Sequence, residues 1–515
     1  MKDTLLMSVD LGTSFIKAAV YDTKSNCIAI ALEPVKDERP APGMFIQKGD
    51  DLYASAVACM KKVCGEVGSR AQEIEAVAFT GQMSGFMGVD RDWNDITTWS
   101  CSLDNRYMPY AERQMKDLKK DFLEISGTNA PQMAPKFEWF KTEFPRENKK
   151  IAKYLMISGY IIGKLGDMDI EDAILDTTYT EWTGLADIRK GEWSQRICDA
   201  IGLDRKYLPK IVQSNYICGH LSARAAAMIG LTSGIPLVSG AGDKAAGCIG
   251  AAVVEPADMI FEASSYGEIS FLAEDYRPDM KTGRIDCIPS PIPGYFLATK
   301  FVAGSGITID WYVNTFLRRE GEKLSSVFAR VEKEMNDIPV GCDGLMAIGL
   351  LGGSSMPLDG TLRGMWMGHD WSHKSAHFYR ALLESFSYDF ELTINKIEEL
   401  YPEYSPQSVK IVGGGAKSPF WTQMNADVTG KTYQVLDRED VAMWGVAMLA
   451  GNAIGVFDDI KETAKKHVGI AKEYVPDPAM REKYRPFKEL YEEYVVSLHD
   501  FYKKIQETGE QAAGR

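Results

Sequence analysis

A short segment near the start of the chain carries residue types that can hold a phosphate and a metal ion. Residues 10–14 read DLGTS between two strand-like runs, and Lys17 follows. The glycine lets the main chain approach an anion, Thr13 and Ser14 offer hydroxyl donors, and Lys17 adds a positive charge. Asp10 can hold Mg²⁺, through water because Mg²⁺ keeps part of its hydration shell. The same pattern also occurs in plain turns, so this segment alone leaves both interpretations open.

A second acidic residue lies in a similar setting near the middle of the chain. The run 236–240 (PLVSG) predicts a buried strand, and it leads into Gly242 and Asp243. Asp10 also ends the first strand of the chain, so each half carries one carboxylate just past its opening strand. Lys244, beside Asp243, is interpreted either as a second residue of the pocket or simply as a neutral partner.

The elements that must position these carboxylates are short strands mixed with helices, which predicts an α/β fold. In open α/β sheets the loops at the carboxyl ends of strands bind the ligand, so we expect Asp10 and Asp243 to face each other across a cleft. A chain of 515 residues also exceeds what one hydrophobic core supports, which predicts two domains. The predicted strands are 4–10, 15–22, 27–33, 74–79, 236–240, 259–262, 268–272, 295–301 and 408–412, and the predicted helices include 51–67, 383–397 and 480–507.

The overall composition argues against several classes of protein. An apolar fraction of 45% and a charged fraction of 25% are average for globular proteins. The net charge of −14 argues against a nucleic-acid partner, although main-chain N–H groups, a lysine and Mg²⁺ can still hold a nucleotide. No apolar run approaches the roughly 20 residues of a membrane span, and the first residues do not resemble a signal peptide. We therefore expect a cytoplasmic protein without a membrane partner, whose nine cysteines are reduced.

Four motifs follow one another along the chain: 10–14 (DLGTS), 81–83 (GQM), 240–243 (GAGD) and 413–416 (GGGA). In this order and spacing they resemble the FGGY carbohydrate kinases, and most closely the xylulokinase-like branch, from residue 4 to residue 475. The resemblance implies duplicated actin-like (RNase H-like) domains that flank a deep catalytic cleft. The expected division is an N-terminal domain at 1–235, a C-terminal domain at 236–480 and a helical tail at 481–515.

The resemblance also implies a role for each matching residue. Asp243 would be the general base that takes the proton of the sugar hydroxyl, and Asp10 would position Mg²⁺. The residues implied to bind ATP and its phosphates are Thr13, Ser14, Lys17, Ser264, Ser265, Gly304, Gly414, Gly415 and Ala416. The residues implied to bind the sugar are Gln82, Met83, Ser84, Asp104 and Asp243. Family behaviour implies a homodimer.

Four departures from the family pattern bear on this resemblance, and one is that residues 352–354 (GGS) stand where the family has Gly-Glu-Arg. Xylulokinases have His where this chain has Ser84, and the family has glycine where this chain has Ala263. A longer segment follows Trp99, in which we match Asp104 and Arg106 to the Asp and Arg of the family. The alternative for these last two residues is an ion pair on the surface, worth about 0–1 kcal/mol.

The sequence therefore predicts ATP-dependent phosphorylation of a hydroxyl of a small sugar, with a pentulose of the xylulose type as the first expectation. Other substrates stay open: L-xylulose, ribulose, a tetritol or another polyol, a deoxy-ketose or a signalling sugar. Two alternatives come from other classes, a different actin-like ATPase and a non-catalytic sugar-binding regulator. The 81–83 motif argues against the first, and the second would normally carry a basic helix-turn-helix segment that the sequence does not contain.

Overall fold

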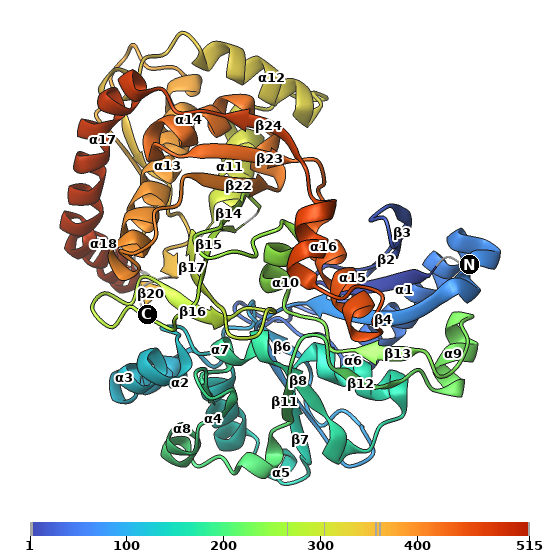
Figure 1. Cartoon of the computed structure of the whole chain (residues 1–515). Coiled ribbons are helices and arrows are strands. Elements are labelled where there is room, and N and C mark those ends of the chain that lie inside the picture. The colour runs from blue at the N-terminus through green and yellow to red at the C-terminus, as the bar shows by residue number, and fades with distance from the viewer. Residues whose placement is uncertain (1–3, 265, 303, 356–357, 360–361, 513–515) are drawn as a thin grey trace.

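Two large mixed sheets with helices around them form the framework of the protein (Figure 1). The structure is a computed structural model, and it describes residues 4–264, 266–302, 304–355, 358–359 and 362–512. In Figure 1 the first sheet lies in the lobe coloured blue to green, and the second lies in the lobe coloured yellow to red. The predicted α/β class is confirmed. The longer helices are α1 (Gly49–Val67), α2 (Met108–Asp117), α4 (Met133–Glu143), α6 (Ile157–Gly166), α10 (Asp243–Gly250), α11 (Ser305–Tyr312), α12 (Leu324–Met335), α13 (Ser375–Leu400), α14 (Pro419–Thr429), α15 (Val441–Ala453), α16 (Ile460–His467), α17 (Pro478–Ser497) and α18 (His499–Ala512).

The first sheet has six strands in the order β12-β13-β4-β1-β2-β3. β1 and β2 form a tight antiparallel pair in which Asp10 lies opposite Lys17, and β4 runs parallel to β1 on its other side. Parallel neighbours end at the same edge of a sheet, so residues 10–14 and 81–84 meet there. The strands are β1 (Leu5–Leu11), β2 (Phe15–Asp22), β3 (Cys27–Pro34), β4 (Ile74–Gly81), β12 (Ile217–His220) and β13 (Pro236–Val238).

The second sheet repeats this arrangement, with seven strands in the order β16-β17-β15-β14-β22-β23-β24. β14 pairs antiparallel with β15 and parallel with β22, just as β1 pairs with β2 and β4. Glu262 ends β14 and so takes the place that Asp10 has near the end of β1. The strands are β14 (Met259–Glu262), β15 (Gly267–Ala273), β16 (Asp286–Pro289), β17 (Phe296–Val302), β22 (Ser408–Val412), β23 (Thr432–Leu436) and β24 (Ile470–Tyr474).

One predicted strand lies in a different sheet from the one expected. The sequence predicted that the run at 236–240 opens the second half, but β13 belongs to the first sheet. A short buried strand fits either sheet by its pattern, and the parallel pairing of Leu237 with Val77 of β4 fixes it in the first. Asp243 therefore follows the last strand of the first sheet, and the chain enters the second sheet at β14.

Helices α10 and α15 pack against each other between the two lobes (Figure 1). Glycines make this crossing close, since a Cβ at Gly250 would lie 1.7 Å from the carbonyl oxygen of Val441. A Cβ at Gly445 would lie 2.1 Å from the carbonyl oxygen of Ala246. No side chain fits at such distances, so both positions require glycine. Because α15 also packs on β1 and β4, a helix from the second half completes the hydrophobic core of the first.

A small three-stranded sheet in the order β6-β5-β7 continues the first lobe. β5 (Gly85–Val89) begins directly after the 82–84 motif, and β6 (Ser100–Cys101) directly precedes the segment with Asp104. β7 (Lys153–Leu155) pairs with the far end of β5. This sheet therefore holds both segments that the sequence assigned to the sugar.

The charged end of the chain forms α17 and α18, which lie along the second lobe (Figure 1). Tyr484, Tyr491 and Tyr502 are buried in the hydrophobic core of that lobe. The guanidinium of Arg380 on α13 donates a hydrogen bond of 3.3 Å to the hydroxyl of Tyr484. Within the described residues, no helix combines the length and the apolar character needed to cross a membrane.

Candidate active site

Asp243 is the first residue of α10. One of its carboxylate oxygens accepts a hydrogen bond of 2.8 Å from the main-chain N–H of Lys244. Burial raises the pKa of Asp243 to about 7, the charge of Lys244 opposes this rise, and the charges of Glu262 and Asp10 add to it. A carboxyl group with a pKa near neutral pH is suited to take a proton from a substrate hydroxyl.

Asp10 lies in the same site as Asp243. Its carboxylate is 3.8 Å from the ammonium of Lys17, which faces it across the hairpin. Burial raises the pKa of Asp10, the charge of Lys17 lowers it, and the charge of Glu262 raises it further. Since the charges of Asp10 and Glu262 both act on Asp243, the structure brings the two predicted aspartates together.

Lys244 lies among carboxylates that the sequence analysis missed. Its ammonium is 2.8 Å from an oxygen of Glu262 and 3.8 Å from an oxygen of Glu268. Burial lowers the pKa of Lys244, but the charges of Glu262, Glu268 and Asp243 raise it above its ordinary value. The structure thus pairs Lys244 with Glu262 and Glu268, and a role for Lys244 in the pocket stays a prediction. Nothing in the spacing marks Glu262 and Glu268, because they meet only through the pairing of β14 with β15.

The oxygen donors at this site suit a hard cation. Mg²⁺ in proteins takes one or two carboxylates and completes its shell with water and phosphate oxygens. Asp10, Asp243 and Glu262 supply such oxygens, and the charges of Asp10 and Glu262 both act on Asp243. Among the residues that the structure describes, no group of three or more His, Cys, Asp or Glu is arranged to hold a metal ion by itself. The residues therefore fit a Mg²⁺ that is bound together with a nucleotide, and the contact to Asp10 stays a prediction.

The predicted sugar motif lies directly beside this acidic site. Gln82, Met83 and Ser84 are buried just after β4. The main-chain N–H of Gln82 donates a hydrogen bond of 3.3 Å to the carbonyl of Leu11, at the end of β1. Met83 packs so closely on the residue before Asp243 that a Cβ at Gly242 would lie 2.5 Å from its Cγ. The 82–84 motif thus lies next to both predicted aspartates.

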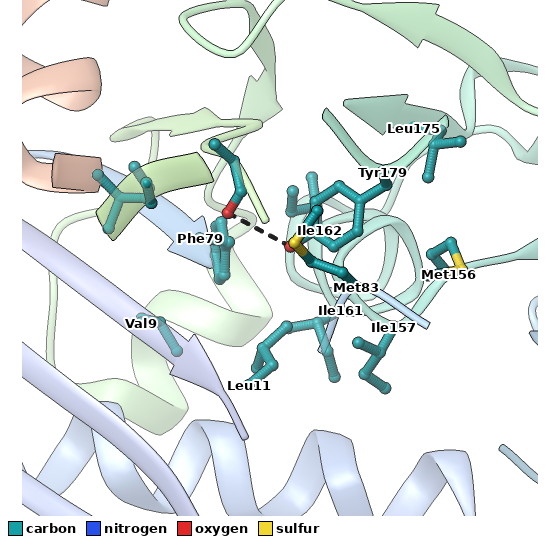
Figure 2. Close-up of a cluster of buried hydrophobic side chains, with 14 of the residues drawn as sticks. Val9, Leu11, Phe79, Met83, Met156, Ile157, Ile161, Ile162, Leu175 and Tyr179 are labelled. Carbon is teal, nitrogen blue, oxygen red and sulfur yellow. Dashed lines mark hydrogen bonds between the residues drawn. The ribbon is translucent and has the colours of Figure 1, made fainter. Parts of the chain in front are cut away.

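An apolar cluster supports the motif from behind. Figure 2 shows Met83 and Tyr179 in one buried cluster with Phe79 of β4 and Ile161 of α6. The dashed line in Figure 2 is the hydrogen bond of 3.4 Å that the hydroxyl of Tyr179 donates to the carbonyl of Ala241. Close packing of this kind holds the side chains of the motif in fixed positions.

Several polar atoms at the motif have no hydrogen-bond partner within the described part of the chain. They are Nε2 of Gln82, Oγ of Ser84 and Oγ of Ser100 at the start of β6, and all three are buried. The other amide atom of Gln82, Oε1, accepts a hydrogen bond of 3.3 Å from the indole N–H of Trp99. Buried polar atoms are normally hydrogen-bonded, so these three favour a polar ligand such as a sugar.

Asp104 is fully buried and paired with Arg106. Its two carboxylate oxygens accept hydrogen bonds of 2.8 and 2.6 Å from the guanidinium, which also stacks 4.7 Å from the ring centroid of Trp139. The alternative of a surface ion pair is wrong, because Asp104 is 0% exposed. A contact of Asp104 with a sugar stays a prediction.

The glycine-rich run packs against the end of β14. The main-chain N–H of Gly415 donates a hydrogen bond of 3.0 Å to the carbonyl of Ala263. A Cβ at Gly415 would lie 2.6 Å from the Cβ of Ala263, so the alanine that replaces the family glycine is accommodated by a glycine opposite it. Gly414, Gly415 and Ala416 thus lie next to Ser264, whereas Ser265 lies outside the described residues.

The remaining predicted phosphate residues lie at the first hairpin and at the start of α11. Thr13 and Ser14 connect β1 to β2, with Ser14 exposed. Gly304 has φ +80° and precedes α11, a conformation that favours glycine. Its neighbour Ser305 lies against the start of β15, 2.7 Å from where a Cβ on Gly267 would be.

Gln47 is a further residue that the sequence analysis missed. Its side-chain amide donates a hydrogen bond of 2.9 Å to the main-chain carbonyl of Thr13. Its main-chain carbonyl accepts a hydrogen bond of 2.8 Å from the main-chain N–H of Trp99. Gln47 is buried and so ties the phosphate segment to the segment beside Gln82. A single glutamine between two elements gives no signal in the sequence.

Comparison with known families accounts for most of the chain. Residues 5–250 match the N-terminal domain of the FGGY family of carbohydrate kinases, and residues 268–454 match its C-terminal domain. The chain belongs to the FGGY family of carbohydrate kinases and is a sugar kinase. FGGY kinases use ATP as their phosphate donor.

Individual relatives carry different names. A xylulose kinase of Bacillus subtilis (strain 168) is 25% identical over 500 residues, which cover 96% of this chain and 97% of that protein. An autoinducer-2 kinase of Enterobacter sp. (strain 638) is 25% identical over 513 residues, which cover 93% and 92%. Two solved structures from Lactobacillus acidophilus share the fold at 20% identity, each covering 98% of this chain and 100% of the other. They are a xylulose kinase with a TM-score of 0.89 and a gluconate kinase with a TM-score of 0.88.

Proposed function

We propose that this sugar kinase phosphorylates a hydroxyl of a pentulose of the xylulose type, with Asp243 as the general base. One observation supports this most strongly: Asp243 lies within electrostatic reach of Asp10 and directly beside the buried 82–84 motif. The carboxylate of Asp243, which can accept a proton, thereby lies between a candidate magnesium site and a candidate sugar pocket.

In this proposal the residues of the chain mainly position the reactants. Asp243 takes the proton of the attacking hydroxyl as the new bond forms, and correct placement matters more than a large pKa shift. Gln82 and Ser84 form hydrogen bonds with sugar hydroxyls. They use Nε2 of Gln82 and Oγ of Ser84, the buried atoms that have no partner among the described residues. Met83 and the cluster behind it exclude water from the reacting hydroxyl, which limits hydrolysis of the donor.

The other predicted residues would hold the nucleotide. When bound, Mg²⁺ would supply positive charge against the developing charge on the phosphates of ATP. Asp10 would hold the ion through water, and Lys17 would place its ammonium near a phosphate. The other proposed contacts to ATP come from main-chain or hydroxyl groups of Thr13, Ser14, Ser264, Gly304, Gly414, Gly415 and Ala416.

A signalling sugar is the second candidate substrate. The autoinducer-2 kinase named above is as similar in sequence as the xylulose kinase, at 25% identity. Ser84, which stands where xylulokinases have His, also leaves a smaller and differently polar group at the pocket. Both observations concern which sugar is bound, and the proposed phosphoryl transfer is the same for either sugar.

A coupled assay of ADP release tests the proposal. The panel contains D-xylulose, L-xylulose, ribulose, a tetritol, gluconate and autoinducer-2, each with Mg²⁺ and ATP. We expect the highest kcat/KM with D-xylulose. A higher value for autoinducer-2 or another member would replace the proposed substrate. Stimulation by no member would favour a sugar-binding regulator or another actin-like ATPase over a kinase for these sugars.

A further inference from the structure

A buried hydrogen-bond chain leads from the end of β8 (Ile174–Asp176) to the start of α10. Asp176 is 1% exposed, and one of its oxygens accepts a hydrogen bond of 2.9 Å from the main-chain N–H of Thr178. The same oxygen accepts the hydroxyl proton of Thr178, and the second oxygen accepts a hydrogen bond of 2.7 Å from Ser214. The carboxyl of Asp176 is therefore held from both sides.

Thr178 connects Asp176 to the segment that precedes Asp243. Its hydroxyl accepts a hydrogen bond of 2.8 Å from the main-chain N–H of Gly242, and the side chain is 0% exposed. A hydroxyl has one proton to donate, and Asp176 takes it, so the lone pairs of Thr178 are left to face Gly242. The orientation of the hydroxyl is thus set by Asp176 and not by solvent.

Gly242 is the residue directly before Asp243. It is the N-cap of α10, so its position fixes where the helix starts and where the first side chain points. The preceding residue of this segment is fixed too, because the main-chain N–H of Ala241 donates a hydrogen bond of 3.1 Å to the carbonyl of Phe79. Tyr179 adds the contact to Ala241 shown in Figure 2.

We propose that Thr178, oriented by Asp176, is a positioning residue that places the carboxylate of Asp243 through the main chain of Gly242. The inference rests on the proposed role of Asp243 as the base. Neither residue was singled out in the sequence, because a threonine two positions after an aspartate is a common turn pattern.

Thr178→Val tests the proposal, since valine keeps the shape of threonine and removes the acceptor. The matched control is Thr183→Val. Thr183 is also buried. Its hydroxyl donates a hydrogen bond of 2.5 Å to the carbonyl of Thr180 and accepts one of 3.0 Å from the main-chain N–H of Leu185. Neither hydrogen bond involves the 240–243 segment. Both variants lose one donated and one accepted hydrogen bond, so both should lose comparable stability.

The kinetic readouts separate positioning from stability. For Thr178→Val we expect a loss of about 10- to 100-fold in kcat with the KM of sugar and ATP changed by less than about threefold. Thr178→Ser should restore kcat to within about threefold of wild type, and Thr183→Val should keep it. Faster hydrogen exchange of the Gly242 amide in Thr178→Val should accompany the loss. Thr178→Ala gives a second test if the valine variant does not fold.

Asp243→Asn is measured in parallel. If Thr178→Val keeps full kcat while Asp243→Asn is inactive, the positioning proposal fails and the proposed base stands. Equal losses of kcat in Thr178→Val and Thr183→Val would also overturn it, because stability alone would explain them. If Asp243→Asn itself keeps normal turnover, the proposed base is wrong and the positioning role is lost with it.

Discussion

The ammonium of Lys244 lies 2.8 Å from a carboxylate oxygen of Glu262, so an ion pair joins the first turn of α10 to the end of β14. α10 follows the last strand of the first sheet, and β14 belongs to the second sheet. The candidate site is therefore built from both sheets, and the ammonium of Lys244 connects them beside Asp243.

Replacing this cation should destabilise the protein strongly. Lys244→Met would leave the buried Glu268 and the partly exposed Glu262 without their partner. Breaking a fully buried pair costs about 3–5 kcal/mol, so we expect a loss toward the lower end of that range. Urea unfolding at neutral pH measures the change in the free energy of unfolding. The exposed Lys466→Met is the control and should change it by less than about 0.5 kcal/mol. Equal stability of the two variants would show that Lys244 does not compensate these acids.

Removing polar atoms from the pocket should weaken binding of the sugar alone. Gln82→Met and Ser84→Ala each delete a buried atom without a partner among the described residues. We expect each change to raise the KM of the sugar about 3- to 10-fold, as for the loss of one neutral hydrogen bond, while the KM of ATP stays within about twofold. The buried Ser126→Ala, which loses a hydrogen bond to the carbonyl of Ala186, is the control. Equal effects on both KM values would argue against a sugar pocket at this motif.

Much of the fold could be predicted because local patterns determine it. The hairpin strands of the first sheet are short β-rich runs between turns, and their observed bounds agree with the predicted runs to within a residue or so. β14 and β22 were predicted with their observed limits, since each is a short apolar run with clear ends. The motifs at 10–14, 81–83 and 240–243 also lie next to one another, and the motif at 413–416 lies against the end of β14 at Ala263.

The relationships that the sequence did not reveal depend on pairing between distant segments. β13 could not be assigned to a sheet, because a buried strand of three residues has the same pattern in either. Glu262 and Glu268 become partners of Lys244 only through the register of β14 and β15. Thr178 and Gln47 act through bonds to main-chain groups, and such bonds leave no trace in residue type or spacing.

The pKa of Asp243 predicts how activity depends on pH. The proposed base must be ionised, and burial raises its pKa to about 7. At saturating ATP we expect kcat/KM for the sugar to fall tenfold per pH unit below an apparent pKa of about 7, or somewhat lower where Mg²⁺ favours the ionised form. Activity should be level above that pKa. A profile that stays flat down to about pH 5 would contradict the assignment of this carboxyl as the base.

A second pair of acids predicts how stability depends on pH. Glu181 and Asp286 are buried side by side between the lobes; burial raises the pKa of Glu181 well above its ordinary value and that of Asp286 to about 7. Both groups bind protons more tightly in the folded state, so the stability they contribute is present at low pH and is lost as the pH rises through about 7.

Glu181→Gln should remove most of this loss, because it replaces one of the two acids by a neutral donor. We expect the free energy of unfolding to rise by about 1–3 kcal/mol at about pH 8 and to change much less at about pH 5. The exposed Glu124→Gln should change it at neither pH. Destabilisation by Glu181→Gln at the higher pH would show that the ionised pair stabilises the folded protein instead.

Turnover by Asp243→Asn tests the central claim most directly. The substitution keeps size and polarity and removes the ability to accept a proton, so with the best sugar of the panel at saturating ATP and Mg²⁺ we expect kcat to fall by at least about 100-fold. The melting temperature and the KM values should stay close to those of the wild-type protein. A kcat within about threefold of the wild-type value would show that Asp243 is not the base of this kinase.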